Sequence, residues 1–543
     1  MEQQGLGEIL PATRIAAMVS AGHWRNEKWF AFFDESARRH PDKTAIVSFN
    51  SAQLRTERLT YADLNAAVER LVLAIEDWDI PAGSVVSVQL PSWWQFIAVM
   101  LACARLGIAV NPIMPTARQQ DLRHVLSLTG SRLLFIPKVF RNICYQELIE
   151  EIRSDLPDLQ HVVVVDGIGL NSFHGLPEPR APRSTAAGSA AHDSNSIAEV
   201  MFTSGTTGEP KGVMHTWNTL IASTRGFAER LELSPNDIIF MGSPLAHQTG
   251  FLWGSVLPVF LGATVVLLDV WNPERAVALI AQEKATFSVA APTFLTDILA
   301  LHEKGNVQVS TLRTFLLAGA PVPRVLVELA AEKVGVRIAS AWGMTEVALP
   351  TITRPTDSVD KVAGSDGAPL DGTEIRVVGL NGEIQATGQE GRLEARGAFN
   401  FVGYLKRPEL YATDSHGWFD TGDLAFIDAD GYVRITGRTK DIVIRGGENI
   451  PVVEVENVLY RHPAIAEVAV IAVPDPRLGE RACACVTLNQ GFTLGFEEMV
   501  AFLGKAGLTK TYFPERLEII TEMPRTPSGK IQKYQLRSRF GKS

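Results

Sequence analysis

Short apolar runs alternate with stretches of helical pattern along much of the chain before residue 340. Residues 84–90, 132–136 and 161–165 are typical of buried strands, and residues 93–106 are typical of a helix. Further apolar runs of the same kind occupy residues 197–202, 238–241, 263–268, 285–289 and 314–317. Because such alternation favours parallel sheets covered by helices, we predict an α/β fold with two such sheets.

The pattern changes at about residue 361. Glycines then recur between short alternating runs up to about residue 436, which predicts a small antiparallel sheet or barrel. Beyond residue 438, a helical segment at 451–461 and strands at 466–473 and 482–488 predict a compact α+β module. We therefore predict an N-terminal domain over residues 1–437, with a β-rich subdomain at about 361–436, and a C-terminal domain over 438–543.

Composition narrows the possible functions. The chain has 543 residues, of which 46% are hydrophobic and 20% charged, as expected for a globular protein of more than one domain. A net charge of −9 argues against nucleic acid as a partner, and four scattered cysteines are too few for a disulfide framework or a zinc site. The longest apolar stretch, 96–104, is too short to span a bilayer, and the N-terminus lacks a secretory pattern. We predict a cytoplasmic protein without stable membrane insertion, and homo-oligomerisation stays open.

The most specific stretch reads Thr-Ser-Gly-Thr-Thr-Gly-Glu-Pro-Lys-Gly and begins at Thr203, directly after a predicted strand. Glycines let backbone N–H groups turn toward an anion, hydroxyls add uncharged donors, and Lys211 adds a cation. This combination suits a polyphosphate, although Pro210 interrupts the usual P-loop spacing. An exposed Ser/Gly/Thr turn without a ligand is the alternative, and the length of the string makes it the weaker one.

This string resembles the phosphate loop of the adenylate-forming superfamily, which includes acyl-CoA synthetases, adenylation domains of peptide synthetases and beetle luciferases. Other motifs match the superfamily in the same order over nearly the whole chain. The resemblance implies ATP as a substrate and makes Thr206 a catalytic candidate. It assigns nucleotide binding in this loop to Thr203, Ser204, Gly205, Thr206, Thr207, Gly208 and Lys211.

Two further stretches are expected to hold the base and a metal. Ala-Gly-Ala-Pro, ending at Pro321, resembles the stretch that lies along the adenine in the superfamily. Ser-Ala-Trp-Gly-Met-Thr-Glu, ending at Glu346, resembles the Tyr-Gly-x-Thr-Glu motif, with Trp342 in place of the commoner tyrosine. Glu346 is the expected Mg²⁺ ligand and a catalytic candidate, because Mg²⁺ takes carboxylate and phosphate oxygens; a core tryptophan and a surface carboxylate are the alternatives. The expected nucleotide-binding residues are Gly319, Ala320, Pro321, Trp342, Gly343, Met344 and Thr345.

The resemblance also assigns roles near the predicted domain boundary. Asp423, at the end of a Gly-Trp-Phe-Asp-Thr-Gly-Asp stretch, would accept hydrogen bonds from the ribose diol. Arg438, which ends the Ile-Thr-Gly-Arg motif that starts at Ile435, would close over the same sugar. Lys440 would be the hinge about which a mobile C-terminal domain swings, and Gly446 would line the tunnel for the pantetheine arm. An ordinary turn is the alternative for each of these short stretches.

The last motif, Pro-Arg-Thr-Pro-Ser-Gly-Lys, ends at Lys530. In the superfamily the matching lysine bridges the carboxylate and the α-phosphate, so Lys530 is the principal catalytic candidate. His247 lies where relatives that activate fatty and aromatic acids often place a histidine or an aromatic residue; it would gate the acyl pocket or position the thiol, and a structural histidine is the alternative. Residues 246–249 lack the aspartate that pairs with an amino-acid substrate, so an uncharged acid is expected.

Together these motifs predict a ligase that uses ATP and Mg²⁺ to activate an apolar carboxylic acid and transfers it to coenzyme A, releasing AMP and pyrophosphate. The chain resembles short- and medium-chain acyl-CoA synthetases, including ligases for alicyclic acids such as cyclohexanecarboxylate. One alternative is a stand-alone activating enzyme that loads a carrier protein. Others are a luciferase-like oxygenase and a binding protein that has lost catalysis.

Overall fold

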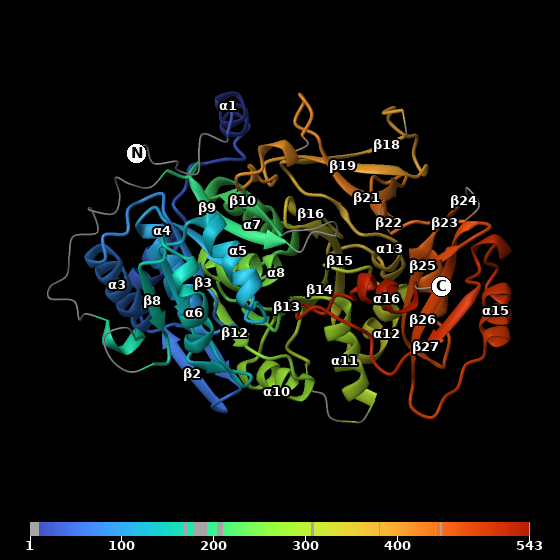
Figure 1. Cartoon of the computed structure of the whole chain (residues 1–543), viewed down its shortest axis with the longest axis horizontal. Coiled ribbons are helices and arrows are strands. Elements are labelled where there is room, and N and C mark those ends of the chain that lie inside the picture. Colours follow the sequence, from blue (N-terminus) through green and yellow to red (C-terminus); the bar gives the residue numbers. More distant parts are fainter. Residues whose placement is uncertain are drawn as a thin grey trace.

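The computed structural model describes residues 10–167, 172–176, 193–203, 210–303, 305, 309–379, 381–411, 413–439, 441–445 and 448–541. Two large sheets form the body of the molecule, and two smaller sheets follow along the chain (Figure 1). The predicted α/β fold is therefore confirmed. Among these residues, no helix combines the length and the apolar character needed to cross a membrane.

The first large sheet has seven strands. In spatial order they are β20 (Gly403–Tyr404), β10 (Lys211–Thr216), β9 (Ile197–Thr203), β4 (Ala109–Pro112), β3 (Val85–Val88), β5 (Leu133–Ile136) and β8 (His161–Val164). The strands from β9 to β8 pair in parallel, as expected from the alternating pattern. The antiparallel strands β10 and β20 extend one edge, and the sequence analysis did not predict either of them.

The second large sheet has nine strands. In spatial order they are β17 (Ala368–Pro369), β16 (Ala348–Ile352), β15 (Arg337–Met344), β14 (Thr314–Leu317), β13 (Phe287–Ala290), β11 (Ile238–Met241), β12 (Thr264–Leu268), β1 (Thr44–Asn50) and β2 (Arg55–Thr60). Its centre is parallel, and antiparallel strands close both edges.

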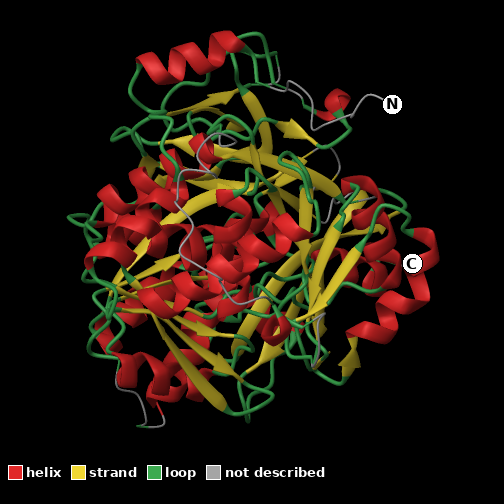
Figure 2. Cartoon of the chain, turned by 90° about the vertical axis from the view of Figure 1, so that its left-hand side faces the viewer, coloured by secondary structure: helices red, strands yellow, loops and turns green. Residues whose placement is uncertain are grey.

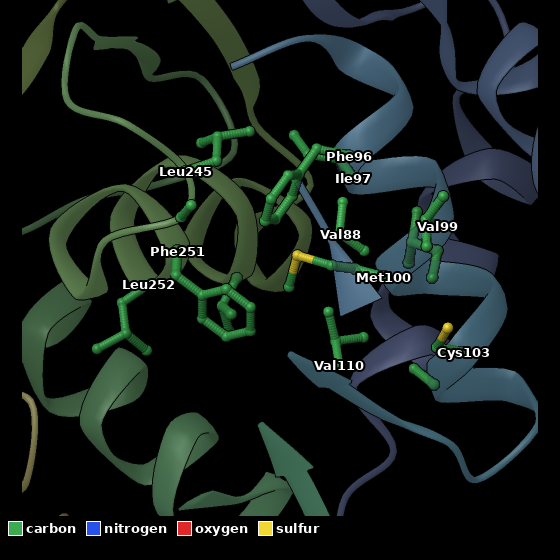
Figure 3. Close-up of a cluster of buried hydrophobic side chains, with 14 of the residues drawn as sticks. Val88, Phe96, Ile97, Val99, Met100, Cys103, Val110, Leu245, Phe251 and Leu252 are labelled. Atoms are coloured by element: carbon green, nitrogen blue, oxygen red, sulfur yellow. The ribbon is translucent and has the colours of Figure 1, made fainter. Parts of the chain in front are cut away.

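Helices pack around the large sheets and around the C-terminal sheet described below (Figure 2). They are α1 (Ala12–Ser20), α2 (Trp29–Arg39), α3 (Tyr61–Asp77), α4 (Trp94–Arg105), α5 (Gln119–Thr129), α6 (Tyr145–Ile152), α7 (Trp217–Leu231), α8 (Gln248–Phe251), α9 (Leu257–Leu261), α10 (Pro273–Glu283), α11 (Pro292–Glu303), α12 (Arg324–Val334), α13 (Val359–Gly364), α14 (Val452–Leu459), α15 (Phe496–Lys505) and α16 (Lys533–Phe540). A π-helical turn, Leu252–Val256, joins α8 to α9. Helix α4 is apolar around most of its surface because it lies inside the core, where Phe96 and Met100 share a cluster with Phe251 (Figure 3).

Two smaller sheets follow the large ones. The four-stranded antiparallel sheet contains β18 (Thr373–Val378), β19 (Gly391–Gly397), β21 (Phe419–Ile427) and β22 (Val433–Arg438). The C-terminal sheet contains β23 (Val443–Arg445), β24 (Glu448–Ile450), β25 (Ile465–Asp475), β26 (Gly479–Leu488) and β27 (Arg516–Ile519), and it lies beside α12 and α16 (Figure 1). The predicted domain boundary at residues 437/438 falls at the last residue of β22, a few residues before the C-terminal sheet begins, and stays a prediction.

Phe227 on α7 is a stringent test of core packing. Its ring is fully buried, stacks on Trp253 with ring centroids 3.7 Å apart, and meets the edge of Phe287. We expect Phe227→Ala to lower the free energy of unfolding by about 3–5 kcal/mol, because a buried ring is replaced by a cavity. The measurement is the urea midpoint, with Phe227→Leu as the milder control. An alanine variant as stable as the wild type would contradict this account of the core.

Candidate active site

The predicted phosphate loop connects two paired strands. Thr203 ends β9 and lies opposite Lys211, the first residue of β10. The candidates between them, Ser204, Gly205, Thr206, Thr207 and Gly208, lie outside the residues that the structure describes. Strand β20 pairs with β10 on its other side, and the Leu405 N–H donates to the Gly212 carbonyl at 2.8 Å. The exit of the loop is therefore held by a segment almost two hundred residues further along the chain.

This pairing brings Tyr404 to the candidate metal ligand. The Tyr404 hydroxyl donates to Glu346 Oε1 at 2.8 Å, and the Phe401 N–H donates to the Glu346 carbonyl at 2.7 Å. The ring of Tyr404 also lies beneath the Lys211 ammonium, 5.2 Å from the ring centroid. Burial raises the pKa of Glu346, and the hydrogen bond from Tyr404 opposes that shift. Tyr404 thus links the phosphate-loop lysine to Glu346, and no motif in the sequence pointed to it.

A second residue that sequence reasoning missed is His215 on β10. Its Nε2 lies 2.7 Å from the Thr345 carbonyl oxygen and its Nδ1 lies 3.0 Å from Thr219 Oγ1. A carbonyl can only accept, so Nε2 carries the proton. Burial lowers the pKa of His215 to about 4, so the imidazole is neutral at pH 7. His215 therefore fixes the backbone immediately before Glu346 without adding charge.

The residues expected to bind the ribose form a second buried cluster. Asp423 on β21 is only 2% exposed, and both of its carboxylate oxygens accept a hydrogen bond. The Trp342 indole Nε1 donates to Oδ2 at 2.8 Å, and Arg438 Nε donates to Oδ1 at 2.7 Å. The charge of Asp423 raises the pKa of Arg438. Trp342 is buried in an apolar cluster, so its ring contributes to the core as well as to the site.

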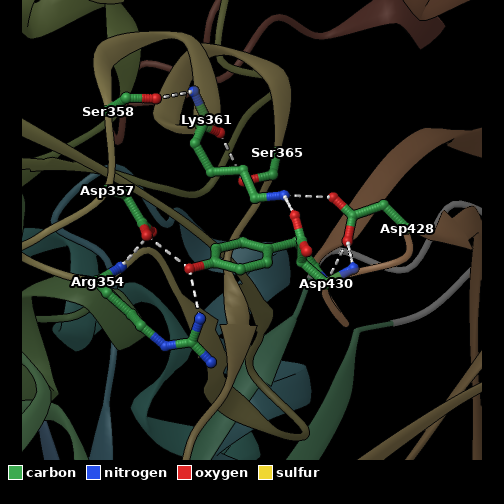
Figure 4. A network of polar contacts seen from close by, with 8 residues as sticks. Arg354, Asp357, Ser358, Lys361, Ser365, Asp428 and Asp430 are labelled. Carbon is green, nitrogen blue, oxygen red and sulfur yellow. Dashed lines mark hydrogen bonds and ion pairs between the residues drawn. The ribbon is translucent and has the colours of Figure 1, made fainter.

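A polar network fixes the hairpin between β21 and β22 that carries Asp423 and Arg438. Lys361 on α13 donates to Asp428 at 2.8 Å and to Asp430 at 2.7 Å (Figure 4). The Tyr432 hydroxyl donates to Asp357 at 2.6 Å. Since Lys361 and Asp357 belong to the segment that follows β16, these bonds hold the hairpin against the nine-stranded sheet.

The remaining nucleotide-binding candidates lie in turns or in the strands next to them. The stretch from Gly319 to Pro321 follows the parallel strand β14, and Gly319 has a φ of +83° that favours glycine. A Cβ on Gly343 would lie 1.9 Å from the Ala348 carbonyl oxygen, so the turn between β15 and β16 itself requires this glycine. The backbone N–H of Ile435 donates to the buried Asp366 at 2.9 Å. Met344 ends β15, next to Thr345 and Glu346.

The C-terminal module brings Lys530 to the same site. Its backbone N–H donates to Thr526 Oγ1 at 3.0 Å, inside a tight loop. Burial, with a smaller contribution from the nearby Arg438 guanidinium, lowers the pKa of Lys530 to about 8. Burial, together with the charge of Lys530, lowers the pKa of His247 to about 4. Lys530, Arg438 and His247 therefore share one electrostatic environment, although they come from segments far apart in the sequence.

His247 also has a local structural role, because its Nδ1 accepts from the Thr249 N–H at 3.3 Å at the start of α8. Its predicted function as a gate or a thiol-positioning group stays a prediction. The hinge candidate Lys440 and the tunnel candidate Gly446 lie outside the described residues.

Comparison with known proteins decides the family. The profile of the AMP-binding enzyme family matches residues 33–405, and that of the AMP-binding enzyme C-terminal domain matches residues 454–530. The chain belongs to the AMP-binding enzyme family. The resemblance to adenylate-forming enzymes that the motifs indicated is thereby confirmed.

The similarity to known proteins extends over nearly the whole length of this AMP-binding enzyme. The medium-chain fatty-acid–CoA ligase of Escherichia coli (strain K12) is 37% identical over 528 residues, which are 96% of this chain and 92% of that protein. Human mitochondrial medium-chain acyl-CoA ligase ACSF2 is 30% identical over 93% of this chain and 86% of its own. Among solved structures, the anthranilate CoA ligase AuaEII in complex with anthranoyl-AMP has a TM-score of 0.86 at 25% identity, covering 95% of this chain and 97% of that one. ATP-bound MatB from Rhodopseudomonas palustris has a TM-score of 0.84 at 26% identity, covering 95% and 99%.

The residues present fit a Mg²⁺ ion that arrives with a nucleotide. Across the described ranges, no group of three or more His, Cys, Asp or Glu side chains could hold a metal by itself. Glu346 offers one carboxylate beside Lys211 and the exit of the phosphate loop. One carboxylate plus substrate phosphates and water is the ligand set that Mg²⁺ commonly takes.

The pH dependence of stability tests the environment of His215. Its pKa is about 4 in the folded protein and about 6.5 in the unfolded chain, so the unfolded chain binds the proton first and stability is lost as the pH falls from 6.5 toward 4. Between pH 7 and pH 5 this loss is about 2 kcal/mol. In His215→Gln the drop in urea midpoint between these pH values should be smaller, whereas His416→Gln, at an exposed site, should behave like the wild type. An undiminished drop in His215→Gln would contradict the assignment.

Tyr404→Phe tests the link between Tyr404 and Glu346. The variant keeps the ring beneath Lys211 and removes the hydroxyl that donates to the carboxylate. If Glu346 holds Mg²⁺, the Mg²⁺ concentration for half-maximal activity should rise about 10-fold, because a hydrogen bond to a charged group is lost. The increase in melting temperature produced by ATP with Mg²⁺ should shrink as well. Tyr534→Phe, at an exposed tyrosine, is the control, and an unchanged Mg²⁺ dependence would refute the link.

Proposed function

We propose that this AMP-binding enzyme is an acid–thiol ligase that joins a short- or medium-chain or alicyclic carboxylic acid to coenzyme A through an acyl-adenylate. It is ATP-dependent and releases AMP and pyrophosphate. The observation that carries the proposal is 37% identity to a medium-chain fatty-acid–CoA ligase along 96% of the chain.

In the first step a carboxylate oxygen of the acid attacks the α-phosphorus of ATP, and the bond to pyrophosphate breaks. Negative charge then builds on the oxygens around phosphorus, where fixed cations stabilise it. Lys530 and Arg438 supply the positive charge. The two groups lie close enough together for Arg438 to lower the pKa of Lys530. Glu346 would hold a Mg²⁺ ion that neutralises charge on the triphosphate, and Asp423 would bind the ribose.

In the second step the thiol of coenzyme A attacks the acyl carbon, and AMP leaves. Lys530 fills the side of the site that faces the C-terminal module. The module therefore has to move before a thiol can approach from that side. We assign the hinge to Lys440 and the wall of the thiol channel to Gly446, as the superfamily resemblance implies.

The segment around His247 favours an uncharged acid. The neighbouring Gln248 donates to the buried Glu199 at 3.2 Å, and burial raises the pKa of Glu199 to about 8. This carboxyl is therefore mainly protonated at pH 7 and offers no anion to an ammonium group. His247, whose pKa is about 4, is neutral as well. A substrate tail without charge suits such surroundings.

A panel of acids tests the proposed function. Linear, alicyclic, aromatic and amino acids are offered with ATP and Mg²⁺, and acid-dependent exchange of pyrophosphate into ATP is measured. Medium-chain or alicyclic acids should give the fastest exchange, and adding free coenzyme A should release AMP and form the thioester. Absence of AMP release with every acid would exclude the function, and adenylation without transfer to free coenzyme A would favour a carrier-protein acceptor.

Lys530→Ala separates the two steps. We expect adenylation to slow by about 10²–10³, the typical cost of removing one donor that stabilises developing charge. Thioester formation from preformed acyl-adenylate should change much less, since the lysine acts on the groups that react during adenylation. Lys505→Ala, an exposed lysine on α15 of the same module, is the matched control. Equal losses in both half-reactions would refute the role of Lys530.

A further inference from the structure

The indole of Trp342 is joined to the candidate ribose carboxylate. Its Nε1 donates to Asp423 Oδ2 at 2.8 Å, and both side chains are buried. The bond connects β15 of the nine-stranded sheet with β21 of the four-stranded sheet, 81 residues apart in sequence. A tyrosine, the commoner residue in the superfamily motif, has no N–H at this point of its ring, so this bond follows from the tryptophan in this chain.

We infer that Trp342 is a positioning residue for ribose recognition, which holds the Asp423 carboxylate so that its free lone pairs are available to the two ribose hydroxyls. The inference rests on the proposed role of Asp423 as the ribose acceptor. It adds a residue that acts through Asp423 and determines how well the site distinguishes a full ribose from a deoxyribose.

The count of acceptor positions supports this role. An ionised carboxylate has about four lone-pair positions. Trp342 and Arg438 each use one, on different oxygens, which leaves about two for a vicinal diol. With the indole N–H removed, the carboxylate could turn about its terminal torsion, because such sp³–sp² torsions are broad.

The two donors differ in rigidity. The Arg438 side chain is 38% exposed, and a long side chain at the protein surface keeps several rotamers open. Trp342 is 7% exposed and packs in one cluster with Val213, Tyr404 and Phe419. Arg438 therefore mainly balances the charge of Asp423, and the closely packed indole of Trp342 sets the orientation of the Asp423 carboxylate.

The test compares ATP with 2′-deoxyATP and 3′-deoxyATP in the wild type and in Trp342→Phe. Pyrophosphate release is measured at saturating acid, and kcat/KM is determined for each nucleotide. Trp342→Phe should lower kcat/KM for ATP about 10-fold, the effect of losing a hydrogen bond to a charged group. The deoxy analogues should lose less than about 3-fold, so that discrimination against them shrinks while the KM of the acid stays the same.

A second variant separates the loss of the indole N–H from any disturbance of core packing. Replacing Trp342 by 3-benzothienylalanine keeps the fused rings and removes only the N–H, and the same reduced discrimination is expected. Trp94→Phe is the matched control: Trp94 donates its indole N–H to Glu57 on β2, at the opposite edge of the nine-stranded sheet from β16 and β17, and discrimination should stay at the wild-type level.

The outcomes separate the inference from the proposed function. Equal losses for ATP and both analogues, or unchanged discrimination in both variants, would overturn the positioning role. A wild-type enzyme that uses ATP without discriminating against either analogue would overturn the inference and leave the ligase function intact. A wild-type enzyme that never releases pyrophosphate from ATP would overturn the ligase function, and the inference with it.

Discussion

A buried carboxylate has to be paired, and this requirement holds the site of this AMP-binding enzyme together. Glu346 accepts from Tyr404, and Asp423 accepts from Trp342 and Arg438. The three donors belong to β20, β15 and β22, which lie in three different sheets. Pairing two carboxylates therefore fixes how the seven-, nine- and four-stranded sheets meet, so the candidate nucleotide site and the junction of the sheets depend on the same bonds.

The charges that remain are arranged for an anion. Lys211 and Lys530 lie near a site in which Glu346 and Asp423 already have partners. Burial and the nearby Arg438 lower the pKa of Lys530 to about 8. Part of the positive charge of Lys530 is therefore lost near that pH. A bound polyphosphate would raise this pKa again, since an opposite charge favours the protonated ammonium. In the proposed function, binding of the nucleotide would therefore restore the full positive charge of Lys530.

Much of the fold follows from local pattern. The buried strands β11 and β14 were predicted at the residues where they occur, because a short apolar run between helices has few alternatives. The edge strands β10 and β20 were missed: β10 carries Lys211 and Gly212, which were interpreted as loop residues, and β20 is only two residues long.

The site divides in a similar way. Motifs predicted roles for Glu346, Asp423, Arg438 and Lys530, because a long string of residue types is specific even when each residue alone is not. Tyr404 and His215 were not predictable, since each acts through one hydrogen bond to a residue more than fifty positions away. The indole bond of Trp342 was missed for the same reason. Contacts of this kind depend on sheet register, which a single sequence does not reveal.

The loop before Lys530 fits the N-terminal domain with almost no clearance. A Cβ on Gly529 would lie 2.5 Å from Thr293 Oγ1 and 2.9 Å from Phe294 Cε2, and its φ of +87° favours glycine independently. A hydrogen atom seats tightly there but contributes little adhesion, because dispersion grows with the number of atoms in contact. The contact at Gly529 is therefore selective for shape, but it adds little attraction between the two parts of the chain. A contact of this kind suits the movement that we propose for the C-terminal module, because it defines one docked position without a strong attachment at this point.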